Sequence, residues 1–202
     1  MLELAKRDRR AERREATVAE ILEAAWELAR IQGLAGISLR ELAQKIGMRP
    51  PSLYWYFDSK NAIYDAMFAQ GNRQLLALMA EVDWPDDAKG ILRLSARKFV
   101  EFSMENIERF QLLFQRTIPG FEPSPEAYAL AMEVVQQMRA RLAAAGLTDP
   151  RAFDVCTALV SGISSQQIAN EPGGNRWVRL IDEMVDVFAD HLLLKQKAKE
   201  KG

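Results

Sequence analysis

The stretch from Ser38 to Lys60, SLRELAQKIGMRPPSLYWYFDSK, decides how the N-terminal part of this chain folds. Ser38 can cap a first helix, and Glu41 three residues later completes the spacing of a capping box. Gly47 suits the left-handed position that ends a helix, and Pro50–Pro51 fit the first turn of the next helix, where missing amide donors cost little. The first helix has one apolar face, formed by Leu39, Leu42, Ala43 and Ile46. The stretch therefore predicts two short helices joined by a tight turn.

The second of these helices carries more polar-tipped aromatic surface than a small core element needs. Ser52, Tyr54, Trp55 and Tyr56 fall within one short segment. A helix-turn-helix that places its second helix in the major groove of DNA explains both the turn and the aromatic residues. Leu53 and Phe57 are expected to point inward and to anchor that helix in the core.

These residues resemble the TetR family of transcriptional repressors. The family pattern is an alanine-rich first helix, a glycine, a capped second helix, a leucine-tyrosine-x-x-phenylalanine recognition helix and a lysine that opens a long fourth helix. The residues that match are Ile21-Leu22-Glu23-Ala24-Ala25, Gly33, Ser38, Gly47, Leu53-Tyr54-Trp55-Tyr56-Phe57 and Lys60. The Pro50–Pro51 pair departs from the pattern, because the family more often has a polar residue and a glycine there. The resemblance covers roughly residues 14–64.

The predicted DNA contacts fall into two groups. Thr17, Tyr54 and Lys60 are expected to contact phosphates and to set the register of the protein on the duplex. A second group is expected to face base edges and the thymine methyl group. It consists of Ser52, Trp55 and Tyr56, together with Arg49 and Pro51 near the turn.

The N-terminal residues 1–16 are predicted to form a basic arm ahead of the first helix. Residues 1–14 hold six basic and three acidic residues, which is typical either of a solvated extension or of an arm that contacts phosphates or the minor groove. Thr17 and Glu20 have capping-box spacing, so the first helix is expected to begin there. The predicted division is then 17–64 for the helix-turn-helix domain and 65–202 for a sensing and dimerisation domain.

Composition indicates an ordinary globular protein, with 49% apolar and 27% charged residues. No apolar run is long enough to span a membrane and no secretory signal is evident, so a cytoplasmic protein without a membrane partner is expected. The single cysteine, Cys156, excludes an internal disulfide framework. The net charge is −1, and residues 1–60 hold 11 Lys/Arg against 9 Asp/Glu, a mild asymmetry that is weak evidence by itself.

The rest of the chain reads as further helices, without a strand pattern or a repeat. After a long helix from Lys60 to about Val82, the expected spans are 87–106, 107–116, 124–145, 149–170 and 175–198. The fold class predicted is all-α, with about nine helices: a three-helix DNA-binding domain followed by a larger helical domain for ligand binding and dimerisation.

Catalysis is not expected, because an enzyme needs a nucleophile with a base, a metal cluster or a phosphate-binding loop. The only histidine, His191, lies on an amphipathic helix with no partner in the sequence. Cys156 has no cysteine or histidine at ligand spacing, so it reads as a buried apolar residue or, less simply, as a redox-sensing thiol. Gly173–Gly174 reads as a turn. No cofactor and no metal are predicted.

Two features indicate what residues 65–202 do. The last two helices carry a broad apolar stripe, which either packs inside one chain or meets a partner; the family resemblance favours a homodimer interface at Leu159, Ile163, Trp177, Ile181, Met184, Phe188 and Leu192. The middle helices are rich in Phe and Met, which line adaptable pockets as well as ordinary cores. The resemblance favours a cavity for a small apolar effector, and the candidate lining residues are Phe99, Phe102, Phe114 and Met132.

The predicted function is a repressor that binds a palindromic operator in double-stranded DNA as a homodimer and is released by an unidentified small apolar effector. One alternative is a similar DNA-binding regulator that answers to a protein or to a thiol change instead of a ligand. A helical adaptor without a nucleic-acid role is a third.

Overall fold

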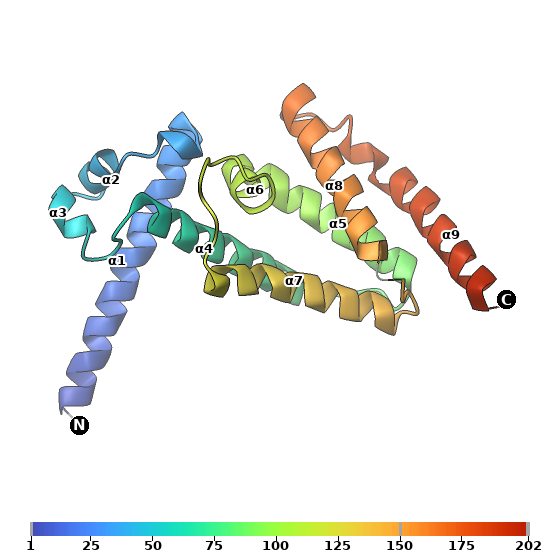
Figure 1. Cartoon of the computed structure of the whole chain (residues 1–202), viewed down its shortest axis with the longest axis horizontal. Coiled ribbons are helices and arrows are strands. Elements are labelled where there is room, and N and C mark those ends of the chain that lie inside the picture. The colour runs from blue at the N-terminus through green and yellow to red at the C-terminus, as the bar shows by residue number, and fades with distance from the viewer. Residues whose placement is uncertain (1, 150, 201–202) are drawn as a thin grey trace. The chain divides into compact units, whose positions relative to one another are not determined.

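The computed structural model of the protein describes residues 2–149 and 151–200. In these residues the chain forms nine α-helices and two 3-10 turns, with no strand (Figure 1). The all-α prediction is confirmed. The elements are α1 Leu2–Gln32, η1 Leu34–Gly36, α2 Leu39–Lys45, α3 Pro50–Leu53, α4 Lys60–Ala80, α5 Ala88–Glu105, α6 Ile107–Phe114, α7 Pro125–Ala144, α8 Arg151–Asn170, η2 Val178–Leu180 and α9 Ile181–Glu200.

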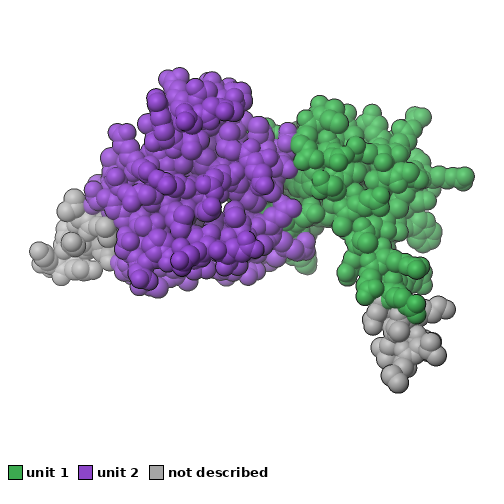
Figure 2. Space-filling view, turned by 180° about the vertical axis from the view of Figure 1, so that it is seen from behind, with its two compact units in different colours: residues 1–71, 111–128 green, residues 72–110, 129–202 purple. Residues whose placement is uncertain are grey.

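The chain divides into two compact units (Figure 2). The first unit comprises residues 1–71 and 111–128, and the second comprises residues 72–110 and 129–202. Helix α4 is continuous through the boundary at Gly71. The predicted domain limits at residues 64 and 65 describe functional regions and stay a prediction, whereas the compact first unit also takes in a segment from the middle of the chain.

The first unit is built around the inner face of α1. Ile21 and Ala25 of α1 and Leu42 of α2 are fully buried, and burial of a side chain as large as Ile or Leu stabilises the unit by roughly 1.5–3 kcal/mol. Two buried polar groups fix α1 and η1 against α4. The Trp26 indole donates to Gln70 Oε1 at 2.8 Å, and the Tyr64 hydroxyl donates to the carbonyl of Leu34 at 2.6 Å.

Glycines end α1 and α2 as the sequence predicts. Gly33 and Gly47 have φ values of 76° and 68°, in the left-handed region that favours glycine. After Gly47, the Met48 amide donates back to the carbonyl of Ala43 at 2.8 Å, which closes α2 with the bond pattern of a Schellman motif. The sharp turn between α2 and α3 follows from this closure.

The two predicted capping boxes are wrong. Ser38 does stand at the N-cap of α2, but its side chain makes no capping bond, and the Glu41 carboxylate instead accepts from Gln32 Nε2 at 3.1 Å. Thr17 does not begin a helix, because α1 runs uninterrupted from Leu2, and the Thr17 hydroxyl donates to the carbonyl of Arg13 at 2.9 Å. The segment before Thr17 is rich in strong helix formers and has no Gly or Pro, so the helix continues into it. Residues 2–16 of the expected separate arm are part of α1, and Met1 lies outside the described residues.

In the second unit, α5 packs against α8 and α9. Its buried face recurs at helical spacing, with Ile91, Leu92, Ala96, Val100 and Phe102 among the buried residues. Beside this apolar contact, three basic side chains of α5 form a row of ion pairs with three aspartates of α9. The residues are Lys89, Arg93 and Arg97 on α5 and Asp182, Asp186 and Asp190 on α9. The paired cations Lys89 and Arg93 hold the pKa of Asp186 below its ordinary value.

The last helix begins later than residue 175, and Gln167 explains the difference. This side chain is fully buried at the end of α8. Its Oε1 atom accepts from the amides of Trp177 and Val178 at 2.9 and 3.3 Å, and its amide nitrogen donates to the carbonyl of Glu171. Because these bonds hold the backbone at Trp177 and Val178 out of a regular α-helix, α9 begins only at Ile181.

In the part of the chain that the structure describes, every helix falls short of the length or apolarity needed to cross a membrane.

Candidate nucleic-acid interface

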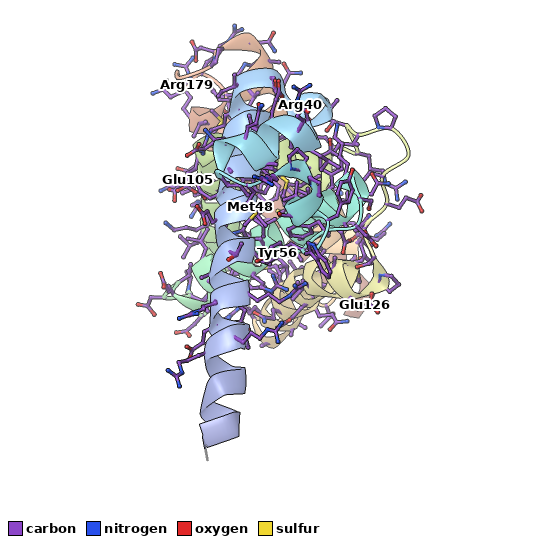
Figure 3. All side chains as sticks on the ribbon, turned by 90° about the vertical axis from the view of Figure 1, so that its left-hand side faces the viewer. Arg40, Met48, Tyr56, Glu105, Glu126 and Arg179 are labelled. Atoms are coloured by element: carbon purple, nitrogen blue, oxygen red, sulfur yellow. The ribbon has the colours of Figure 1, made fainter. Side chains whose placement is uncertain are left out.

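Helices α2 and α3 form a helix-turn-helix in the first unit. Figure 3 marks this region by Arg40 of α2, Met48 of the turn and Tyr56, which follows α3. After its four residues α3 continues as a single turn, in which the Tyr56 amide donates to the carbonyl of Leu53 at 2.9 Å. A helix this short is not stable by itself, so packing must hold it in place.

Leu53 and Phe57 provide that packing. Leu53 is 1% exposed and Phe57 is 8% exposed, so the prediction that both point inward is confirmed. The residues between them face outward instead. Trp55 is 81% exposed and Tyr54 is 55% exposed, which is unusual for aromatic side chains of this size. The structure thus presents an aromatic knob, defined here as residues 54–56, on an anchored turn.

The other predicted base-contacting residues lie around this knob. Arg49 is the N-cap residue of α3, and Pro50 and Pro51 follow at its first positions. Arg49 and Pro51 are exposed, while Ser52 and Tyr56 are half-buried. The structure therefore gathers on one short segment the residues expected to face bases, and their role stays a prediction.

Two of the predicted phosphate contacts already have partners within the protein. The Lys60 ammonium donates to the carbonyl of Ala35 at 2.7 Å and lies 5.5 Å from the centre of the Tyr64 ring. An ammonium has three donors, so Lys60 keeps capacity for a phosphate oxygen. The only donor of Thr17 is its hydroxyl proton, which Arg13 accepts, so a phosphate bond from Thr17 requires breaking that contact.

Ser59 caps α4, because its hydroxyl oxygen accepts from the Ala62 amide at 3.1 Å. Lys60 is the first residue of α4, and the free amides at the start of a helix favour an anion.

The four residues proposed to line an effector pocket do not all belong to one unit. Phe114 lies in the first unit, and Phe99, Phe102 and Met132 lie in the second. Phe102 is buried under the guanidinium of Arg109, whose central carbon is 3.5 Å from the ring centre. Phe99 packs edge-on against Phe110, with ring centres 6.3 Å apart. These contacts are those of core residues.

A small hollow in the first unit has other walls. It measures about 90 Å³ and is lined mainly by apolar residues of α4, α6 and the loop before α7, including Phe68, Leu112, Ile118 and Phe121. No periodic signal marked these residues, because Ile118 and Phe121 come from a loop. None of the four residues predicted to line an effector site borders this hollow, and the position of an effector site stays a prediction.

The apolar stripe predicted to meet a partner is mostly core. Ile163, Ile181, Phe188 and Leu192 are all less than 10% exposed, because α9 uses this stripe to pack on α5 and α8. The dimer-interface role predicted for these residues stays a prediction. Leu159 remains exposed, and Trp177 and Met184 are half-buried.

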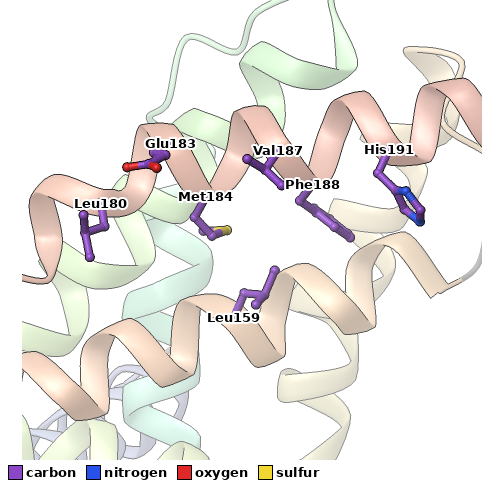
Figure 4. A pocket seen from close by; sticks show the side chains of 7 residues that line it. All are labelled: Leu159, Leu180, Glu183, Met184, Val187, Phe188 and His191. Carbon is purple, nitrogen blue, oxygen red and sulfur yellow. The ribbon is translucent and has the colours of Figure 1, made fainter.

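A different face of α8 and α9 is apolar and open (Figure 4). A groove of about 520 Å³ runs along it. Val187 is 70% exposed, and Val155, Leu159 and Leu180 are between 37% and 41% exposed. The lining residues are Leu159, Leu180, Glu183, Met184, Val187, Phe188 and His191. It lies on the two helices for which the sequence predicts a partner contact, and we call this surface the α8–α9 face.

Among the described residues, no group of His, Cys, Asp and Glu has the arrangement of a metal site. His191 lies on the rim of the α8–α9 face, and Cys156 is buried in α8. Burial raises the pKa of the Cys156 thiol to about 11. A reactive thiol needs the opposite shift, so the redox alternative loses its chemical basis.

We expect Cys156 to react very slowly in the folded protein. With a pKa of about 11, about one thiol in a thousand is ionised near pH 8, whereas a thiol of ordinary pKa is about one-quarter ionised. Reaction with Ellman's reagent should be at least about 100-fold slower than in urea, and its rate should rise with pH towards 11. A rate in the folded protein equal to that in urea would restore Cys156 as a sensor candidate.

Comparison with known proteins shows which family the helix-turn-helix resembles. Residues 21–67 match the family model described as bacterial regulatory proteins, tetR family. The uncharacterized HTH-type transcriptional regulator YobS of Bacillus subtilis is 33% identical over 86 residues, which are 43% of this chain and 45% of YobS. The class D tetracycline repressor protein of Escherichia coli is 43% identical over 47 residues, or 23% of this chain and 22% of that protein. The chain thus spans less than half the length of these relatives.

Solved structures extend the likeness of fold to most of the chain. The TetR family regulator PfmR of Thermus thermophilus superposes with a TM-score of 0.60 at 24% identity, covering 83% of this chain and 96% of PfmR. The regulator FadR of Bacillus subtilis, solved in complex with stearoyl-CoA, superposes with a TM-score of 0.65 at 16% identity, covering 84% and 96%. Residues 21–67 therefore match the DNA-binding region of the TetR family, and most of the chain shares its all-helical fold with these solved structures.

Proposed function

We propose that the protein is a cytoplasmic repressor that binds a palindromic operator in double-stranded DNA as a homodimer. The observation that carries the proposal is the aromatic knob, which stands exposed on a turn whose two flanking residues are anchored in the core. A core role does not explain an 81% exposed tryptophan, but insertion of a short helix into the major groove does.

Two kinds of contact with DNA are proposed, one to bases and one to phosphates. Arg49, at the exposed start of α3, reads a base edge, and a bidentate pair with guanine is the most common specific contact of an arginine. Lys60, at the start of α4, binds a phosphate together with the first amides of that helix. Ser52, Trp55 and Tyr56 face base edges between these two positions, and Tyr54 contacts a phosphate.

Replacing Arg49 or Lys60 by alanine is expected to weaken DNA binding in two different ways. Loss of Arg49 should cost about 1–3 kcal/mol on the preferred duplex and relax specificity at one base pair. Loss of Lys60 should weaken all duplexes alike and lower the slope of log affinity against log salt by about one unit. The measurement is affinity at several salt concentrations, on a duplex selected by the protein from a random library and on a scrambled duplex.

The outcome for Arg49 decides its role. Equal losses on the selected and the scrambled duplex would show that Arg49 contacts only the backbone. If the unaltered protein selects no duplex and binds DNA without steep salt dependence, the adaptor alternative is favoured instead.

The α8–α9 face is the proposed dimer interface. Its exposed apolar residues and the groove between them form a continuous surface on two helices, and such a surface is typical of a protein contact. A two-fold dimer presents the same face from each protomer and pairs two recognition helices. Half-sites on one side of B-DNA lie about 34 Å apart, or a multiple of this distance, which is why a palindromic operator is proposed.

A small apolar effector is the proposed signal for release. The apolar hollow beside Phe68 and Phe121 supports this, although about 90 Å³ accommodates only a few heavy atoms without widening. Core contacts of Phe99 and Phe102 make them second choices for the site. The relative FadR was solved with a long-chain acyl thioester, which makes apolar acyl compounds the first class to screen.

Release requires that the effector binds one state of the dimer more tightly than the other. Shifting the population from about 1:99 to 99:1 needs about 5.5 kcal/mol of differential affinity, which two sites with couplings of about 1–3 kcal/mol each can approach. Helix α4 belongs to both units without a break, so it is the proposed link between the signal and the helix-turn-helix.

A specific effector is expected to raise the melting temperature of the protein as its concentration rises. At 100 times its dissociation constant it should stabilise the folded state by about 2.7 kcal/mol. A thermal-shift screen of acyl compounds measures this, and enlarging the hollow by Phe121→Ala should change the ranking of ligands by chain length. If no compound shifts the melting temperature while operator binding is intact, the alternative of a regulator that answers to another protein is favoured.

A further inference from the structure

Arg14 of α1 is bound to the aromatic knob, although it is 41 residues distant in the sequence. Its Nη1 atom donates to the carbonyl of Trp55 at 3.1 Å. Carbonyls at the end of a helix have no partner within the helix, and Trp55 lies in the single turn that follows α3. The guanidinium therefore supplies a donor that this short helix cannot supply itself.

The same guanidinium also contacts the neighbouring residue. Its central carbon lies 5.2 Å from the centre of the Tyr56 ring, within the range of a cation–π contact. One side chain thus holds the backbone at Trp55 and the ring of Tyr56. A planar guanidinium can do both, whereas the ammonium of lysine offers the charge without the flat face.

These contacts bear on where the Trp55 ring points. The ring is 81% exposed, so no packing in the protein orients it, and its direction follows from the backbone of its turn. Leu53 and Phe57 anchor the two ends of that turn. In the described structure, the bond from Arg14 is the hydrogen bond that joins residues 54–56 to a distant part of the chain.

We propose that Arg14 is a positioning residue of the recognition turn: it fixes the backbone at Trp55 and the ring of Tyr56 in the orientation that meets base edges. The inference rests on the proposed DNA-binding function and adds a specificity role for a residue of α1. The continuation of α1 through Thr17 is what brings Arg14 to this place, since a flexible arm would not hold its side chain against the turn.

A second explanation gives Arg14 a simpler role. Arg14 is an exposed cation at the edge of the proposed interface, and it could act as a phosphate contact. The two roles differ in their salt dependence, because each phosphate contact contributes about one unit to the salt slope, whatever the sequence. A positioning residue instead changes the ratio of affinities for the preferred and other duplexes.

The test compares Arg14→Gln with Arg13→Gln and Arg14→Lys. Arg13 is the adjacent exposed arginine of α1, so Arg13→Gln removes the same charge from the same helix without touching the knob. The probes are the duplex that the unaltered protein selects from a random library and a scrambled duplex of equal length. Circular dichroism melting verifies that all variants fold.

Relative to Arg13→Gln, we expect Arg14→Gln to weaken binding of the selected duplex about threefold per recognition helix, and so about tenfold per dimer. Binding of the scrambled duplex and the salt slope should match those of Arg13→Gln. Arg14→Lys should restore only part of the loss. The inference is overturned if both glutamine variants lose affinity equally on both duplexes, or if lysine restores binding fully.

A measurement without DNA keeps this inference separate from the proposed function. The contribution of Trp55 to fluorescence is obtained by subtracting the signal of Trp55→Phe from that of the protein with Trp55, in the Arg14 and the Arg14→Gln background. Its anisotropy should fall in Arg14→Gln, because the turn loses its tether. Unchanged anisotropy overturns the inference even if operator binding is found. A fall in anisotropy in a protein that selects no duplex would support the tether and reject the DNA-binding function.

Discussion

Replacing Leu53 by alanine is expected to lower the free energy of unfolding of the first unit by about 2–5 kcal/mol. Leu53 is 1% exposed and is the only buried residue of the four in α3. Since such a short helix has no stability of its own, the cavity left by this side chain should release the whole recognition turn. Urea unfolding followed by circular dichroism measures the loss, and specific DNA binding should disappear with it.

Trp55→Ala is the matched control for this experiment. It removes a larger side chain from the same segment, but that side chain is exposed, so the free energy of unfolding should stay within about 0.5 kcal/mol. Specific DNA binding should nevertheless fall. If Leu53→Ala proves as stable as Trp55→Ala, α3 is held by something other than its buried leucine, and our account of the anchored turn is wrong.

Replacing Val187 by aspartate is expected to convert the proposed dimer to monomers. Val187 is 70% exposed and lies in the middle of the α8–α9 face. Burying an unpaired carboxylate costs several kcal/mol, and two-fold symmetry places the change on both sides of the interface. A loss of at least about 3 kcal/mol weakens dimerisation more than a hundredfold. Sedimentation at several protein concentrations measures this, and operator affinity should fall with the dimer.

Ile31→Asp provides the control, because Ile31 of α1 is 76% exposed and has a similar aliphatic side chain. It adds the same charge to the first unit and should leave the dimer intact. A dimer that survives Val187→Asp, or that is lost equally with Ile31→Asp, places the interface elsewhere.

The parts of the fold that followed from sequence are those set by local rules. Gly33 and Gly47 end helices where a left-handed residue is needed. Leu53 and Phe57 are buried because their spacing places them on one side of a short helix. Each of these outcomes depends on a few neighbouring residues, which a single sequence displays.

The parts that could not be foreseen depend on contacts between distant residues. Glu41 bonds Gln32 instead of closing a box on Ser38, and Gln167 delays the start of the last helix through bonds to a loop ten residues away. The stripe on α9 was visible in the sequence, but which side of it meets α5 was not, since both sides carry apolar residues. The contact between Arg14 and the knob spans 41 residues and leaves no periodic mark.

The sealed position of Cys156, the only cysteine of the chain, has a practical consequence. A cysteine introduced at an exposed position such as Tyr54 would be the one thiol that a nitroxide or a dye reaches quickly, and no native residue would have to be removed first. In a two-fold dimer each protomer carries one such label, so the distance distribution between the two labels reports the separation of the two recognition helices. That separation could be followed directly as candidate effectors are added.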